Sequence, residues 1–150
     1  MAPIRKAFPT DASRLAEILI FAKRTAYRSI FRNDAVSFGE MQVLPLALSY
    51  QAGGEGLPDI WVYDDKFVKG MIHVKNGAVE ELYVDPFFQN CGIGSELLTY
   101  AIEHENARTL WVLEKNHRAI SFYRAHGFLL TGERQLEEGT PEYIIRLTRS

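Results

Sequence analysis

The sequence has one cysteine, Cys91, so no disulfide can form within one chain. It has no run of about 18 apolar residues, and its first residues do not resemble a secretory signal. The formal net charge at pH 7 is only -2, which gives no support for a nucleic-acid partner, since such a partner favours a basic face. We therefore expect a soluble, cytoplasmic protein with neither a membrane nor a nucleic acid as its partner.

Several catalytic motifs are also missing. The four histidines, His73, His104, His117 and His126, do not have the spacing of a metal site such as HExxH. We therefore expect no bound metal. No GxSxG elbow for a serine nucleophile is present. A cysteine nucleophile is disfavoured because no histidine lies next to Cys91 in the sequence.

The composition is that of an ordinary globular protein, with 47% hydrophobic and 24% charged residues. A chain of 150 residues is long enough to bury a sound core. Because no repeat, low-complexity tract or linker divides the sequence, we expect a single domain over residues 1–150.

The order of predicted elements indicates an α/β (α+β) protein. A short strand over residues 3–8 precedes a helical segment over 9–31, with Thr10, Asp11 or Ser13 as its cap. A second helix is predicted over 33–50, which Pro45 should kink or divide. Three strands over 60–63, 67–74 and 78–84 should form an antiparallel meander, because Asn76-Gly77 is a strong hairpin signal.

The second half of the chain predicts a crossover. A helix over 92–106 leads to a buried strand over 109–113, which should lie parallel to the strand over 79–84. A further helix should begin at its cap Asn116 and stop at Gly127. Strands over 128–133 and 143–148 complete the sheet.

The most informative segment is the loop between the third meander strand and the helix that follows it. Gly92 and Gly94 leave backbone amides uncovered where a helix N-terminus points its unpaired N–H groups and positive dipole end. Such a loop favours an anion, usually a phosphate. The spacing matches neither GxxxxGK[ST] nor GxGxxG. Without further evidence, a tight turn with glycines used for packing would explain the same residues.

Two motifs resemble the GCN5-related N-acetyltransferase (GNAT) family. Gln89 to Gly94, after the run LYVDP, is similar to the Q-x-x-G-x-G acetyl-CoA signature of that family. The segment from Asn116 to Phe128 is similar to its second motif, N-x-x-A-x-x-F-Y-x-x-x-G-F. The resemblance implies the GNAT acyl-CoA N-acyltransferase fold, in which helices flank a central twisted, mixed, mostly antiparallel sheet with a splayed parallel strand pair.

The resemblance also implies acetyl-CoA as cofactor and acyl donor. The backbone of Leu82, Tyr83 and Val84 would pair with the pantetheine arm, and the loop would wrap the pyrophosphate. The residues implied to bind the cofactor are Leu82, Tyr83, Val84, Gln89, Asn90, Cys91, Gly92, Ile93, Gly94, Ser95, Asn116, Ala119, Phe122 and Tyr123. Cys91 departs from the family, which often has Lys or Arg there. Arg118 or Arg124 would compensate, although we expect both to be solvated helix residues.

The implied reaction is transfer of an acetyl group to a primary amine by direct transfer in a ternary complex. Tyr123 would protonate the leaving thiolate, since an unperturbed tyrosine is protonated at neutral pH. Strand alternation places Glu80, Leu82 and Val84 on one face and Glu81 and Tyr83 on the other. Glu80 matches the position of the general base best, with a solvated carboxylate as the competing interpretation.

The acceptor is open: a small amine, an amino acid, or a peptide or protein amine. Tyr27 and Phe31 share a helical face and are candidates for its binding site, although core packing explains them equally well. The resembled family also suggests a homodimer. Two alternatives are a catalytically silent acyl-CoA-binding module of the same fold and a dinucleotide-binding domain, the latter disfavoured by the glycine spacing.

Overall fold

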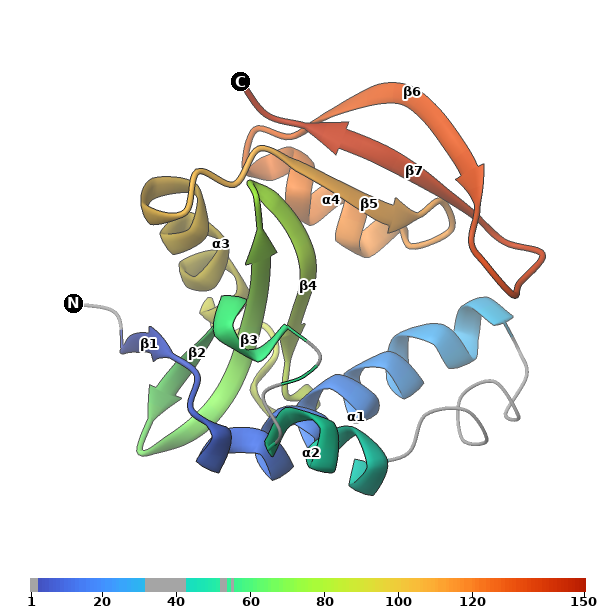
Figure 1. The fold of residues 1–150 in the computed structure, drawn as a ribbon. Helices are drawn as coiled ribbons and strands as arrows, with labels where there is room; N and C mark the ends of the chain where they lie inside the picture. Colours follow the sequence, from blue (N-terminus) through green and yellow to red (C-terminus); the bar gives the residue numbers. More distant parts are fainter. Residues whose placement is uncertain (1–2, 32–42, 52–53, 55) are drawn as a thin grey trace.

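The computed structural model describes residues 3–31, 43–51, 54 and 56–150. Within this part of the chain, seven strands form one sheet in the order β1-β2-β3-β4-β5-β7-β6 (Figure 1). The strands are β1 (Ile4–Lys6), β2 (Ile60–Asp65), β3 (Phe67–Lys75), β4 (Ala78–Val84), β5 (Thr109–Leu113), β6 (Leu129–Leu136) and β7 (Tyr143–Thr148). All neighbouring pairs are antiparallel except β4 and β5.

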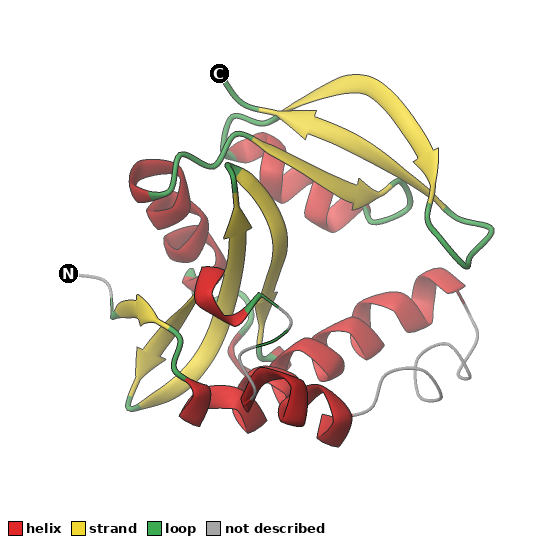
Figure 2. Cartoon of the chain, viewed as in Figure 1, coloured by secondary structure: helices red, strands yellow, loops and turns green. Residues whose placement is uncertain are grey.

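Helices cover the sheet, as Figure 2 shows. They are α1 (Ala12–Phe31), α2 (Val43–Gln51), α3 (Ile93–His104) and α4 (His117–Ala125), with short 3-10 turns η1 (Pro9–Asp11), η3 (Leu57–Asp59) and η4 (Pro86–Phe88). The buried residues form two clusters. One joins α1 and α2 to β2 and β3, and the other joins α3 and the C-terminal strands to the opposite face. The mixed, mostly antiparallel sheet is the predicted architecture.

The local sequence signals account for most of these elements. Asn76 and Gly77 have φ of 52° and 79°, so the turn between β3 and β4 has the left-handed backbone that an Asn-Gly hairpin requires. The Asn116 side chain accepts a hydrogen bond from the Ala119 amide and caps α4. Gly127 follows α4 with a φ of 91°. These three predictions are confirmed.

The second predicted helix is only partly within the described residues. Positions 33–42 of that prediction lie outside them. The described helix α2 has Pro45 in its first turn, where a missing N–H breaks no intrahelical hydrogen bond.

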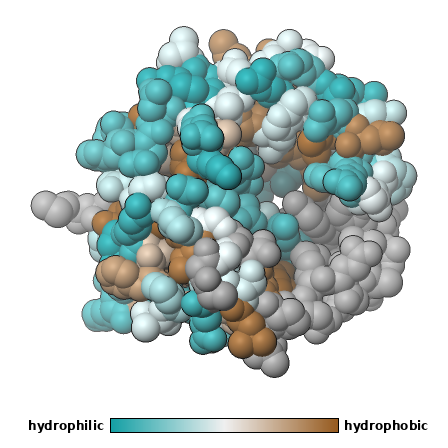
Figure 3. Space-filling view, viewed as in Figure 1, coloured by the Kyte–Doolittle hydropathy of each residue, from teal (hydrophilic) through white to brown (hydrophobic). Residues whose placement is uncertain are grey.

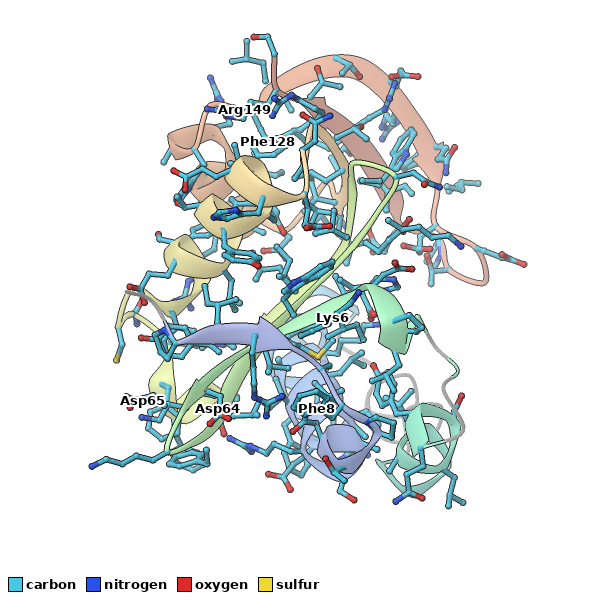
Figure 4. All side chains as sticks on the ribbon, turned by 60° about the vertical axis from the view of Figure 1, so that its left-hand side comes forward. Lys6, Phe8, Asp64, Asp65, Phe128 and Arg149 are labelled. Carbon is cyan, nitrogen blue, oxygen red and sulfur yellow. The ribbon has the colours of Figure 1, made fainter. Side chains whose placement is uncertain are left out.

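The N-terminal strand is tied to the following turn by charged groups. Arg5 donates to both carboxylate oxygens of Asp11 at 2.9 Å and to Asp64 at 3.0 Å. Asp11 also accepts from the Phe8 amide at 2.7 Å, so it fixes the chain before α1 begins. Asp64 and Phe8 are labelled in Figure 4.

The parallel strands β4 and β5 separate after a short contact. Only Ala78 and Val79 have partners on β5, namely Thr109 and Leu110. Figure 1 shows the two strands diverging from this point. The predicted splayed parallel pair is therefore confirmed, and β5 does not pair with β4 beyond Val79.

The alternation predicted for β4 is interrupted by a bulge. Strand alternation predicts that Glu80 lies on the face of Leu82 and Val84. His73 of β3 lies opposite Glu81, and the next residue, Val74, lies opposite Val79. Glu80 is therefore an extra residue without an opposite on β3, which makes a bulge in β4. Val79 therefore packs in the same cluster as Leu82 and Val84, and the bulge breaks the alternation.

The described surface is mixed in character. Figure 3 shows hydrophilic residues over most of the face in view, with hydrophobic residues in separate small areas. None of the helices in the described part of the chain is both long enough and apolar enough to span a bilayer.

Candidate active site

A cleft of about 1140 Å³ lies where β4 and β5 separate. One wall is β4, the other is β5 with α4, and the loop before α3 closes one end. Its lining includes almost every residue that the sequence predicted for the cofactor. These are Leu82, Tyr83, Val84, Gln89, Asn90, Gly92, Ile93, Gly94, Ser95, Asn116, Ala119, Phe122 and Tyr123.

The β4 wall presents a backbone edge that β5 does not cover. Leu82, Tyr83 and Val84 pair with β3 on one side and have no β5 partner on the other. Leu82 and Val84 pack against the α3 and α4 cluster, whereas Tyr83 packs against the α1 cluster. An extended ligand that carries amides can hydrogen-bond to such an edge as an added strand.

The loop before α3 presents a second set of backbone donors. Gly92 is the N-cap of α3 with a φ of 83°, and no side chain caps this helix end. The first N–H groups of α3 therefore face the cleft without a side-chain acceptor. A Cβ at Gly94 would lie 3.5 Å from Phe122 and 3.7 Å from Val84, so this glycine brings α3 close to α4 and β4.

Side chains fix the loop at both ends. The Gln89 amide donates to the Val84 carbonyl at 3.2 Å, which fastens the loop to β4. Arg118 on α4 donates to Asn90 at 2.8 Å. Arg118 is exposed, as expected, and this hydrogen bond also places its cation at the loop.

Cys91 is the exception among the predicted cofactor residues. Its side chain is exposed and does not line the cleft. The thiol lies 3.7 Å from the Gln89 carbonyl, within the same turn.

The acidic residue in the first turn of α3, Glu96, does not line the cleft. Glu96 accepts a hydrogen bond from Tyr63 on β2, and this bond, with burial second, raises the pKa of Tyr63. The positive end of the helix therefore remains suited to a phosphate.

The sequence analysis missed the ion pair that supports the start of this loop. Asp85, which is only 7% exposed, accepts from the Phe87 amide and from Arg14 of α1. Arg14 also donates to the Val68 carbonyl at 2.7 Å. The "VDP" run signals a turn, but nothing in the sequence pairs it with a residue 71 positions away.

The α4 wall carries the predicted acid. Tyr123 and Phe122 are in edge contact, with ring centroids 5.4 Å apart, and both line the cleft. The Asn116 oxygen is engaged in capping α4, so its amide N–H groups are the part that remains for a ligand.

Two carboxylates of β4 reach the cleft. Glu80, the predicted base, is exposed at the bulge. Glu81 is half-buried, lies opposite His73 on β3, and also lines the cleft.

The acceptor side is less completely described. Tyr27 and Phe31 fall in the last turns of α1, and their side chains lie outside the part of the chain that the structure describes. Ala22 and Lys23 of α1 line the cleft and were not predicted. Glu137 from the loop between β6 and β7 also lines it, whereas Glu142 pairs with Lys115 at 3.1 Å.

A meander, a splayed parallel pair and a glycine-rich helix entry at the cleft together define a GNAT-type acyltransferase fold. Solved structures share it. The solution structure of apo-form YjaB from Escherichia coli has a TM-score of 0.74 at 23% identity, covering 99% of this chain and 97% of that one. The Thermoplasma acidophilum PaiA N-acetyltransferase in complex with coenzyme A has a TM-score of 0.61 at 20% identity, covering 99% of both chains.

The sequence comparisons agree with this fold. Residues 57–129 match the acetyltransferase (GNAT) domain family. Peptidyl-lysine N-acetyltransferase YjaB of Escherichia coli strain K12 is 29% identical over 79 residues, which are 52% of this chain. That alignment covers 54% of the relative, so the chain spans about half the length of the curated relative that it matches. Residues 57–129 thus match the GNAT domain family, and the described chain has the GNAT fold.

Proposed function

We propose that this chain is an acetyl-CoA-dependent N-acetyltransferase that transfers an acetyl group directly to a primary amine in a ternary complex. The observation that carries the proposal is the cleft, in which β4 diverges from β5 and leads to the start of α3, which no side chain caps. A strand edge of this kind suits the amides of pantetheine, and the helix start suits the pyrophosphate. A solved relative, yncA of Salmonella typhimurium, has a structure with acetyl-CoA, at a TM-score of 0.64 and 19% identity over 98% of this chain and 92% of that one.

Coenzyme A would then occupy most of the cleft. The backbone of residues 82–84 would bind the pantetheine arm, and the amides of residues 89–95 would bind the pyrophosphate. Arg118 would supply the positive charge that position 91 lacks. Cys91 was predicted at the cofactor; because its side chain is exposed and outside the cleft lining, only its backbone would contribute.

The chemistry would be divided between the two walls. Tyr123 would protonate the thiolate of coenzyme A as it leaves. A carboxylate of β4, with Glu80 as the candidate from the sequence, would accept a proton from the amine. An amide of β4, with Val84 as the candidate, would stabilise the tetrahedral oxyanion.

For the acceptor we propose an amine on a peptide or protein, on the grounds that the relative YjaB is named as a peptidyl-lysine N-acetyltransferase. The exposed Glu80 and the Glu137 loop at the cleft suit a cationic side chain before it loses its proton. Tyr27 and Phe31 remain candidates for the acceptor wall. A cytoplasmic location and a homodimer also remain predictions, and light scattering after gel filtration would measure the second.

The first test is a thermal shift with acetyl-CoA, coenzyme A, NAD and ATP. A ligand at 100 times its Kd stabilises a protein by about 2.7 kcal/mol. Acetyl-CoA and coenzyme A should raise the Tm, and NAD and ATP should not. No shift with acetyl-CoA would contradict the proposed cofactor.

Turnover is tested with acetyl-CoA and a panel of a lysine-containing peptide, poly-L-lysine, spermidine and free amino acids, by measuring release of the free thiol. Release that depends on one acceptor class would support the enzyme. Cofactor binding without release from any acceptor would favour the catalytically silent module.

A further inference from the structure

His73 and Glu81 form a titratable pair on the β4 wall that the proposed reaction does not yet use. They are register partners on β3 and β4, and the His73 Nδ1 lies 3.4 Å from the Glu81 Oε1. Their side chains are only 12% and 21% exposed. Glu81 lines the cleft, so the pair connects the cleft to the less exposed ring of His73.

The second nitrogen of His73 faces a closed environment. Its Nε2 is buried and has no hydrogen-bond partner among the described residues. A Cβ at Gly56 would lie 2.2 Å from the His73 Cε1, so the loop before η3 covers this edge of the ring. A buried polar atom without a partner is uncommon and calls for an explanation such as a catalytic role. The Nδ1, facing Glu81, is the atom through which this ring can exchange a proton.

Other charged groups lie on the elements around the pair. On the neighbouring elements these are Glu80 of β4, Lys75 of β3, Asp59 of η3 and Lys23 of α1. Within the described part of the chain, Glu81 is the only one within hydrogen-bonding distance of His73. Glu80 is exposed at the bulge, so it lacks this connection.

We propose that Glu81 and His73 act as a two-step proton acceptor for the amine, a role that rests on the proposed acetyltransferase function. The N–H bond of the substrate ammonium breaks, and the proton passes to a Glu81 oxygen, either directly or through a water molecule. The Glu81 O–H bond then breaks as the His73 Nδ1–H bond forms. The amine is left neutral with its electron pair free to attack the thioester, and the pair carries the proton until it returns to solvent.

The second step has a physical reason. In water, the ordinary pKa is about 10.4 for an alkylammonium, about 4.3 for a carboxyl and about 6.5 for an imidazolium. A carboxylate alone is therefore a weak acceptor for an amine proton. An imidazole holds the proton more tightly than a carboxylate does, so passing the proton to His73 favours its removal from the amine, while the carboxylate keeps the cleft-facing position.

The test compares kcat/KM across pH in Glu81→Gln, His73→Gln and Glu80→Gln, with acetyl-CoA and the acceptor that turns over fastest in the panel. We expect Glu81→Gln to lose about 100-fold or more, which is typical of a lost general base, and more than Glu80→Gln loses. His73→Gln should lose about tenfold, since it removes the second acceptor and leaves the first, and it should change the acidic limb of the pH profile. His104→Gln, on α3 outside the cleft, is the matched histidine control and should retain the wild-type rate and profile.

A larger loss in Glu80→Gln than in Glu81→Gln would overturn the proposal, as would a wild-type pH profile in His73→Gln. Acetyl-CoA binding by each variant checks that the fold and the cofactor site are intact. Absence of turnover in the wild type would instead count against the proposed function.

The coupling of His73 and Glu81 can also be measured without a substrate, so the pair can be tested even if the wild type shows no turnover. Ring-nitrogen NMR of His73 should show that Glu81→Gln moves the Nδ1 signal and that Lys75→Gln does not. An unchanged His73 signal in Glu81→Gln would show that the two groups are not coupled and would overturn the relay.

Discussion

At the residue scale, Tyr123 is the sharpest test of the chemistry. Removing its hydroxyl in Tyr123→Phe keeps the ring that packs beside Phe122 and Phe128. A lost general acid should lower kcat about 100-fold, with the Kd for acetyl-CoA nearly unchanged. Steady-state kinetics and calorimetric titration measure the two quantities. Tyr100→Phe, on α3 outside the cleft, is the matched control, and an equal loss in both variants would remove Tyr123 from the chemistry.

The two loop glycines should respond differently to alanine. Gly92 has a φ of 83° and open space around its Cβ position, so Gly92→Ala should cost about 1–2 kcal/mol through backbone strain alone. Gly94 does not have a left-handed φ, and a Cβ there would make ordinary contacts at 3.5 Å, so Gly94→Ala should leave the free energy of unfolding nearly unchanged. Urea denaturation measures both. The larger Gly94→Val should abolish acetyl-CoA binding, and normal binding by that variant would contradict the role of the loop.

Single residues also show what the sequence can and cannot predict about the site. Recognisable motifs along the chain make three of the site residues predictable, namely Asn116, Gly92 and Tyr123. The bulge at Glu80 is not predicted, because it adds one residue to the strand without changing its composition. A signal of this bulge is present in the sequence, since two adjacent glutamates between Val79 and Leu82 interrupt the alternation of apolar and polar residues. Arg14 and His73 carry no local signal because their partners are distant in the sequence or on another strand.

At the element scale, the Arg14–Asp85 pair joins α1 to the start of the cofactor loop. Asp85 also holds the Phe87 amide, so Asp85→Ala removes two hydrogen bonds and leaves the Arg14 guanidinium without this partner. Breaking a buried pair in this way should cost about 3 kcal/mol. It should also weaken acetyl-CoA binding, because Gln89 follows directly after η4.

A double-mutant cycle with Arg14→Met isolates the pair. We expect a coupling free energy of at least about 1 kcal/mol from thermal or urea unfolding, as is usual for groups in direct contact. Additive effects of the two substitutions would show that Asp85 acts only as the cap of η4.

The Arg5–Asp11 pair joins β1 to the turn before α1, and its contribution to the free energy of unfolding should depend on pH. Partial burial acts to raise the pKa of Asp11, but hydrogen bonds from Arg5 and the Phe8 amide lower it overall. A carboxyl with a lowered pKa in the folded state contributes stability above its unfolded pKa, about 4, and loses that contribution as pH falls through the folded value.

Asp11→Asn should therefore cost about 1–2 kcal/mol at pH 7, and this difference from wild type should shrink below about pH 4. Urea unfolding at several pH values measures it. Asp65→Asn removes a more exposed carboxylate paired with Lys69 at 3.4 Å and should cost less than about 0.5 kcal/mol. A difference for Asp11→Asn that stays constant down to about pH 3 would contradict the ion-pair explanation.

The elements themselves are largely predictable. The Asn-Gly hairpin, the crossover helix and the cap of α4 follow from turn and capping chemistry, which is local. The strand order is less accessible, because β7 inserts between β5 and β6 and a sequence does not state which edge a late strand joins.

At the scale of the whole molecule, the two parts of the sheet share little backbone pairing. Only two residue pairs join β4 to β5, so side-chain packing must hold the cleft walls at their separation. The cluster beneath α3 does this, since it contains Val74 and Val79 from one part and Leu110 and Leu147 from the other.

Phe128, labelled in Figure 4, lies within that cluster and is fully buried. Phe128→Ala should lower the free energy of unfolding by about 3–5 kcal/mol, because it removes a large side chain and leaves a cavity. Since the cluster joins both cleft walls, acetyl-CoA should restore part of the lost thermal stability. Phe87→Ala is the matched control, because Phe87 is 91% exposed, and it should change stability by less than about 0.5 kcal/mol. Urea and thermal unfolding with and without acetyl-CoA measure these effects, and equal losses in the two variants would show that this cluster does not hold the two parts together.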